Sequence, residues 1–148
     1  MKIGAILAGA SKEDQENLYH FGEYIGLAFQ LQDDFLDVYG DELVFGKAIG
    51  GDICNNKKTY MLINALLRAE GKDKIALDHW ITAGQFDRNE KVTAVTDIYN
   101  RLGIDKLANQ KMEEFYQKAA GYLDMVSVDD ERKTVLRQYA LNMMHRDK

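Results

Sequence analysis

The sequence contains no proline in 148 residues, and this absence constrains the fold more than any other feature of the chain. Proline breaks helices because it lacks an N–H group and its ring clashes with the preceding turn, so only glycine remains to interrupt them. Apolar residues recur at spacings of three and four, and no segment alternates between apolar and polar in the manner of a strand. The sequence therefore predicts an all-α protein, a bundle of about six helices.

The longest predicted helix runs from about Lys12 to Tyr39 and follows a short apolar segment at residues 3–9. Ser11 and Asp14 have the spacing of a capping box, which is typical of a helix start. Apolar residues at helical spacing form one stripe and indicate a buried face. The stripe comprises Leu18, Phe21, Ile25, Ala28, Leu31, Phe35 and Val38.

A glycine-rich loop is predicted at residues 40–56. A loop of this length is uncommon in a compact domain, so a function is the expected reason for it. Asp87 is predicted to cap a later helix that Gly103 ends, and Ser127 to Asp130 are predicted to cap the last one. The other predicted helices lie at residues 57–69, 72–83 and 104–126.

Charge and composition exclude several classes of protein. The formal net charge is -5 and the isoelectric point is near 5.2, which disfavours nucleic acid as a partner because phosphate backbones need a basic surface. No stretch approaches the ~18 to 20 apolar residues of a membrane span. The single cysteine, Cys54, cannot form an internal disulfide, so a cytoplasmic location is expected.

An aspartate cluster lies near the end of the long predicted helix. Asp33 and Asp37 are four residues apart and share one face with Gln30, and Asp34 lies beside them. Crowded carboxylates beside apolar surface need a cation, and an oxygen-only ligand set fits Mg²⁺. The apolar neighbours are Phe29, Leu31, Phe35 and Leu36. A solvated acidic helix face is the alternative interpretation.

Lysines follow the cluster and favour the metal-binding interpretation. Lys47 lies in the glycine-rich loop, and Lys57 and Lys58 come directly after it. Carboxylates that hold a divalent metal beside lysines can bind a diphosphate, because the metal bridges phosphate oxygens and lysine neutralises the remaining charge. The pattern therefore indicates a site for Mg²⁺ and a diphosphate.

Three linked motifs resemble the C-terminal half of the trans-isoprenyl diphosphate synthases, the polyprenyl synthetase family that includes farnesyl and geranylgeranyl diphosphate synthases. They are GEYIGLAFQLQDDFLD at residues 22–37, FGKAIGGDI at 45–53 and NKKTY at 56–60. The resemblance covers residues 3–66 closely and the remainder loosely. It implies the helical isoprenoid synthase fold and a prenyl transfer in which an allylic diphosphate condenses with isopentenyl diphosphate.

The resemblance also implies roles for the acidic residues. Asp33 would be a direct ligand of a catalytic Mg²⁺, and Asp34 and Asp37 would support that site directly or through waters. Asp52 would orient the metal-bound waters or Lys57. Lys57 would contact the diphosphate of the allylic substrate and stabilise it as it departs.

The remaining implied roles concern the substrates. Phe29 and Gln30 match a family pair beside the reacting allylic carbon, and Lys47 would contact the allylic diphosphate. Arg146 and Lys148 resemble basic terminal residues that would close over isopentenyl diphosphate. The resemblance thus implies three catalytic residues, namely Gln30, Lys47 and Lys57.

The family has two aspartate-rich motifs, and this sequence contains one. We therefore expect residues 1–148 to be a single, partial domain without the N-terminal half that holds the first motif. The chain alone is then expected to be inactive, and exposed apolar surface should drive self-association or a homodimer. A non-catalytic subunit of a heteromeric synthase is the main alternative function. A terpene cyclase of the same fold is less favoured, because its Asn/Ser/Glu metal triad is replaced here by aspartates.

Overall fold

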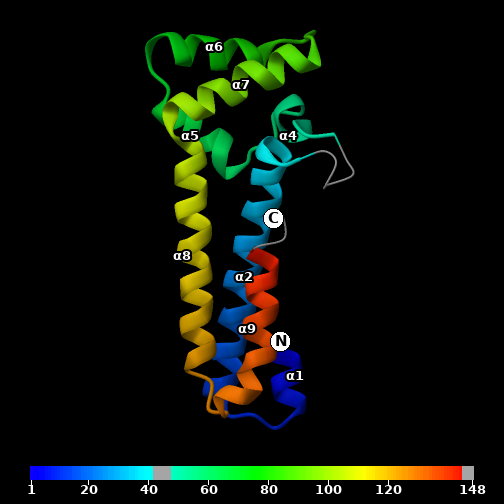
Figure 1. Cartoon of the computed structure of the whole chain (residues 1–148), viewed down its shortest axis with the longest axis vertical. Coiled ribbons are helices and arrows are strands. Elements are labelled where there is room, and N and C mark those ends of the chain that lie inside the picture. Colours follow the sequence, from blue (N-terminus) through cyan, green and yellow to red (C-terminus); the bar gives the residue numbers. More distant parts are fainter. Residues whose placement is uncertain (42–47, 145–148) are drawn as a thin grey trace. The chain divides into compact units, whose positions relative to one another are not determined.

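A computed structural model describes residues 1–41 and 48–144 of the chain. Every regular element in these two ranges is a helix, which confirms the all-α prediction (Figure 1). The helices are α1 (Lys2–Leu7), α2 (Lys12–Tyr39), α4 (Gly51–Cys54), α5 (Tyr60–Arg68), α6 (Gly71–Thr82), α7 (Arg88–Leu102), α8 (Ile104–Asp124) and α9 (Asp130–Met144).

Three of the predicted capping residues, Ser11, Asp87 and Gly103, begin or end helices as expected. The Ser11 hydroxyl accepts a hydrogen bond from the Asp14 N–H at 3.1 Å, and one Asp87 carboxylate oxygen accepts from two amides in the first turn of α7. Gly103 ends α7 with φ of +66°, the left-handed conformation that glycine adopts at helix C-termini. These contacts satisfy amides and carbonyls that a helix leaves unpaired at its ends.

The predicted loop at residues 40–56 differs from expectation in two ways. It contains the one-turn helix α4, and the helix predicted from Lys57 begins three residues later, at Tyr60. The cause of the later start is Thr59, whose extended backbone and side-chain oxygen cap α5 by accepting from Leu62 at 3.1 Å. Lys57 therefore lies in the connection between α4 and α5 and not in a helical turn.

The chain folds into two compact units, each with a core of its own. Unit 1 consists of Met1–Gln30 and Lys111–Lys148, and unit 2 consists of Leu31–Gln110. The core of unit 1 contains Phe21, Ile25, Ala119, Leu123, Val126 and Ala140. The larger core of unit 2 includes Val38, Met61, Ala65, Leu77, Ile98, Tyr99 and Ile104.

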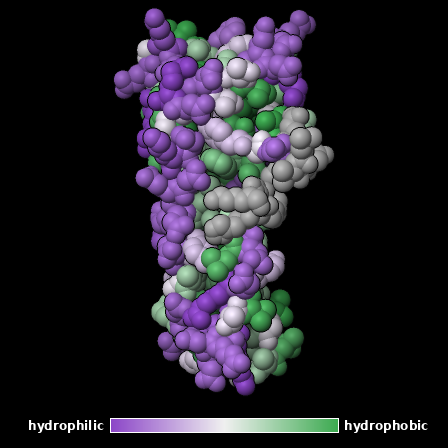
Figure 2. Space-filling model, viewed as in Figure 1, coloured by the Kyte–Doolittle hydropathy of each residue, from purple (hydrophilic) through white to green (hydrophobic). Residues whose placement is uncertain are grey.

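Some apolar side chains remain exposed in unit 1. Figure 2 shows hydrophobic surface at the lower right of the view, over α1, where Ile3 and Leu7 are 75% and 84% exposed. Exposed apolar surface of this kind favours association, so self-association remains a prediction. Across the described residues, none of the helices combines the length and apolar character of a membrane-spanning segment.

Candidate functional site

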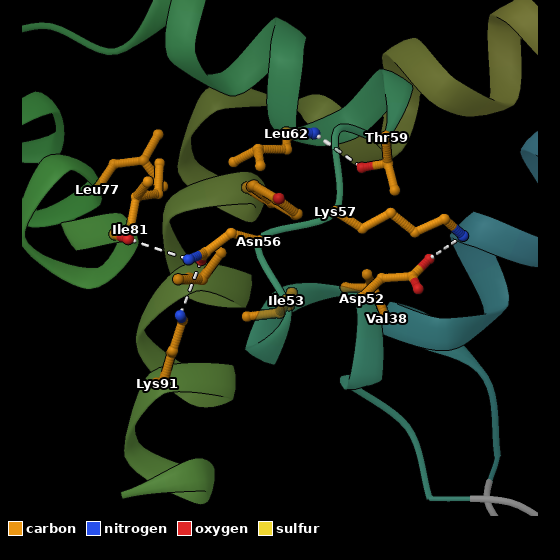
Figure 3. A pocket seen from close by; sticks show the side chains of 12 residues that line it. Val38, Asp52, Ile53, Asn56, Lys57, Thr59, Leu62, Leu77, Ile81 and Lys91 are labelled. Atoms are coloured by element: carbon orange, nitrogen blue, oxygen red, sulfur yellow. Dashed lines mark hydrogen bonds and ion pairs between the residues drawn. The ribbon is translucent and has the colours of Figure 1, made fainter. Parts of the chain in front are cut away.

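One lysine and two aspartates of unit 2 form an ion-paired group. The Lys57 ammonium lies 2.8 Å from Asp34 Oδ1 and 2.8 Å from Asp52 Oδ2. Three different elements supply these side chains: α2 holds Asp34, the first turn of α4 holds Asp52, and Lys57 reaches them from the α4–α5 connection. Figure 3 shows Lys57 extending across the end of α4 toward α2 with Asp52 beside it.

The two carboxylates of this group are more buried than its ammonium. The Asp34 and Asp52 side chains are each 20% exposed, whereas that of Lys57 is 54% exposed. Partial burial raises the pKa of Asp34, and the Lys57 ammonium acts in the opposite direction. Hydrogen bonds to the two carboxylates raise the pKa of Lys57. The ammonium therefore stays charged and acts as the counterion of both aspartates.

Asp37 holds the beginning of α4 against α2. Its carboxylate is buried and accepts a hydrogen bond from the Asp52 N–H at 2.7 Å, while its carbonyl accepts from the Gly50 N–H at 2.5 Å. A Cβ atom at Gly51 would lie 3.4 Å from the same carboxylate. Asp37 thus fixes the backbone that presents the Asp52 side chain.

Helix α7 supports the same turn from its other side. Arg88 donates a hydrogen bond to the Ile49 carbonyl at 2.6 Å, and Val92 packs directly against Gly50. Gly50 has φ of +83° and caps α4, so its lack of a side chain permits both the turn and the close approach of α7. The backbone that leads to Asp52 is therefore held by α2 and α7 together.

The aspartate cluster predicted from sequence occupies three different environments. Asp34 pairs with Lys57, Asp37 holds α4, and Asp33 is half-buried on α2. In residues 1–41 and 48–144, no three side chains of His, Cys, Asp or Glu are grouped so as to hold one metal ion. Carboxylate oxygens are nevertheless the donors that Mg²⁺ prefers, and this ion needs only one or two of them because water and phosphate complete its shell. The carboxylates of Asp33 and Asp34 are donors of this kind.

Of the other predicted site residues, two belong to unit 1 and three lie outside the described residues. Phe29 and Gln30 belong to unit 1; Gln30 is exposed, and Phe29 lines an open hollow of about 450 Å³ with Tyr139, Asn142 and Met143. Lys47, Arg146 and Lys148 lie outside the described residues.

Sequence reasoning missed two residues next to the ion-paired group, Asn56 and Lys91. The Lys91 ammonium donates to the Asn56 side-chain oxygen at 2.8 Å. One signal was present: Lys91 stands four, seven and eight residues before the buried positions of α7 at residues 95, 98 and 99. A lysine in register with an apolar stripe is placed on the buried face.

Replacing Asp37 by alanine is expected to lower the free energy of unfolding by about 2 kcal/mol, because a partly buried Asp52 N–H loses its charged acceptor. Urea denaturation measures this change. Asp37→Asn keeps an acceptor oxygen and should lose less. Asp97→Ala removes an exposed carboxylate of α7 and serves as the control, so equal losses for Asp37→Ala and Asp97→Ala would contradict this role of Asp37.

Comparison with known proteins gives a consistent answer. The polyprenyl synthetase family model matches residues 1–100 of the chain. The short chain isoprenyl diphosphate synthase of Methanothermobacter thermautotrophicus is 36% identical over 135 residues, which cover 90% of this chain and 40% of the relative. The geranylgeranyl diphosphate synthase of Methanosarcina mazei is 35% identical over 151 residues, covering 99% of this chain and 43% of the relative.

Solved structures give the same result. A geranylgeranyl pyrophosphate synthase superposes with a TM-score of 0.89 at 34% identity, covering 99% of this chain and 46% of that structure. A second, from Corynebacterium glutamicum in complex with isoprenyl diphosphate and magnesium, gives 0.85 at 32% identity over 97% of this chain and 40% of that structure. The chain spans about two fifths of the length of the curated relatives described above. These matches confirm the resemblance found in the sequence, and the chain belongs to the polyprenyl synthetase family.

Proposed function

We propose that this chain forms the part of a Mg²⁺-dependent prenyl diphosphate synthase that binds the diphosphate of the allylic substrate. The observation that supports this proposal best is the Lys57 ammonium held at 2.8 Å from both Asp34 and Asp52. Such a group offers carboxylate oxygens to a divalent ion and a cation to phosphate oxygens. Both are needed to neutralise a diphosphate, because neither charge alone offsets it.

The proposed reaction is a head-to-tail condensation. The bond between the allylic carbon and the diphosphate oxygen breaks, and its electron pair leaves with the diphosphate. The double bond of isopentenyl diphosphate then attacks the allylic cation, a carbon–carbon bond forms, and a proton is lost. When bound, Mg²⁺ would supply positive charge to the departing oxygens. A site of fixed charges lowers the barrier because it needs no reorganisation as the charge develops.

The residues of this chain would have different roles in the proposed reaction. Lys57, with Lys47, would bind the departing diphosphate, while Asp33 and Asp34 would hold the metal. Asp37 would keep Asp52 in place, as its contact with the Asp52 N–H suggests.

The substrates would meet other residues. Phe29 and Gln30 would line the site of the allylic chain, and the hollow beside Phe29 is lined mostly by apolar and aromatic side chains. Arg146 and Lys148 would contact isopentenyl diphosphate. A regulatory subunit is not favoured, because relatives at 34% to 36% identity are named as synthases.

Binding of inorganic pyrophosphate to the purified chain tests the proposal. We expect binding that requires Mg²⁺ and that weakens about tenfold in Asp33→Asn, because the variant loses one charge-assisted contact to the ion or its waters. Isothermal titration with and without Mg²⁺ measures both. Asp97→Asn, an exposed site on α7, should bind as the wild type does. Pyrophosphate binding that is independent of Mg²⁺, or whose affinity is the same in Asp33→Asn as in the wild type, would argue against the proposed site.

A further inference from the structure

Lys91 is a buried lysine without an acidic partner. Lys91 is 1% exposed, and it forms no ion pair with a carboxylate of the described residues. Its ammonium instead donates to Asn56 Oδ1 at 2.8 Å and to the Cys54 carbonyl at 3.4 Å, and it lies 4.1 Å from the centre of the Phe86 ring. Burial lowers the pKa of Lys91. A buried ammonium is costly unless its hydrogen bonds are made, so these neutral partners must be held in place.

Water contributes little to the surroundings of this ammonium. The cavity that Lys91 lines, shown in Figure 3, has a volume of about 10 Å³, which is room for one water at most. The other walls include the apolar side chains of Leu77 and Val95 and the ring of Tyr99. The position of the Lys91 ammonium is therefore set by its contacts with the protein.

Asn56 joins three segments of unit 2. Its amide nitrogen donates to the Ile81 carbonyl in the last turn of α6 at 3.0 Å, and its amide oxygen accepts from Lys91 on α7. Its own backbone has φ of +49° in the connection between α4 and α5. Asparagine tolerates this left-handed conformation better than most residues, and two side-chain hydrogen bonds hold it there.

Lys57 follows Asn56 directly and points the opposite way. In Figure 3, Lys91 and Ile81 approach Asn56 from one side, while the Lys57 side chain extends from the same backbone toward α2. The Lys57 N–H donates to the Asp52 carbonyl at 3.0 Å, and its carbonyl accepts from the Thr59 N–H at 2.7 Å. The direction of Lys57 therefore depends on the backbone that Asn56 fixes.

We propose that Lys91 and Asn56 are positioning residues, which hold the α4–α5 connection so that the Lys57 ammonium meets the carboxylates of Asp34 and Asp52. The Lys91 ammonium donates to the Asn56 side-chain oxygen, and loss of this donor would leave a buried acceptor unsatisfied. We infer that Lys91 supplies local order to the connection. The inference uses the proposed function only to explain why the direction of Lys57 matters.

Hydrogen exchange of the full chain tests the proposal without any ligand. In Lys91→Met, which keeps the length of the side chain, exchange at the Lys57 and Thr59 amides should accelerate about tenfold. Amides of α8 should exchange as in the wild type. Mg²⁺-dependent pyrophosphate binding should weaken about fivefold, since residues of one hydrogen-bond network are coupled.

Two further variants isolate the cause. Asn56→Gly keeps the left-handed backbone and removes both side-chain hydrogen bonds, so it should accelerate the same two amides even where Lys91→Met does not fold. Lys133→Met is the matched control: Lys133 is a buried lysine of unit 1 that donates to the Asp124 carbonyl at 2.8 Å, and its loss should leave Lys57 and Thr59 unchanged.

Unchanged exchange at Lys57 and Thr59 in both Lys91→Met and Asn56→Gly would overturn the proposal. Uniform acceleration across all of unit 2 would overturn it too, because that result is general destabilisation. A wild-type chain that binds no pyrophosphate, with the local acceleration intact, would instead remove the proposed function and leave the positioning role standing.

Discussion

Replacing Gly50 by alanine is expected to lower the free energy of unfolding by about 3 kcal/mol, the largest stability loss among the variants described here. Two costs add. Gly50 has φ of +83°, and a residue with a Cβ atom adopts the left-handed conformation at a cost of roughly 1 to 2 kcal/mol. The new Cβ would also lie 2.5 Å and 2.8 Å from the two methyl carbons of Val92, and overpacking costs typically about 1 to 3 kcal/mol.

The variant Gly103→Ala allows the backbone cost to be measured separately from the packing cost. Gly103 has φ of +66° and no atom within 4 Å of an added Cβ, so Gly103→Ala should lose only the backbone contribution. Val92→Ala in the Gly50→Ala background should recover part of the loss by making room for the new methyl group. Urea denaturation of the four proteins measures these differences. Equal losses for Gly50→Ala and Gly103→Ala would show that the contact with Val92 is not tight.

The helices were predictable because their signals are local. Asp87 and Gly103 stand at the ends of a periodic apolar pattern, and the structure places α7 between them. Ser11 begins α2 in the same way. Such caps act within one turn, so neighbouring residues suffice to identify them. The late start of α5 at Tyr60 was missed because the choice of Thr59 as cap depends on where the preceding turn places it.

The candidate site was only partly predictable because its geometry is tertiary. Helical spacing gave Asp33 and Asp37 a common face, but it could not show that the Asp37 carboxylate receives the Asp52 N–H. Lys57 was recognised as a residue of the site from its motif, and its simultaneous pairing with Asp34 follows only from the fold. Lys91 was missed because lysine is ordinarily a surface residue.

Replacing Lys57 by methionine is expected to change two affinities in opposite directions. Binding of pyrophosphate in the presence of Mg²⁺ should weaken about 30-fold to 100-fold, because a charged hydrogen-bond donor to the diphosphate is lost. Binding of Mg²⁺ alone should strengthen about fivefold, since Asp34 and Asp52 lose the ammonium that now neutralises both of them. The fold should be little affected, because ion pairs this exposed stabilise proteins by less than about 1 kcal/mol.

The opposite signs distinguish an internal counterion from a general loss of structure. A damaged fold would weaken the binding of both ligands. Removal of the competing Lys57 ammonium alone should instead strengthen the binding of Mg²⁺ and weaken the binding of the diphosphate. Lys74→Met is the control, because Lys74 is an exposed lysine of α6 in the same unit; it should leave both affinities as they are. Isothermal titration with MgCl₂ and then with pyrophosphate measures the dissociation constants of both ligands on one sample. Weaker Mg²⁺ binding in Lys57→Met would contradict the counterion role, and unchanged pyrophosphate binding would contradict the role of Lys57 as a diphosphate contact.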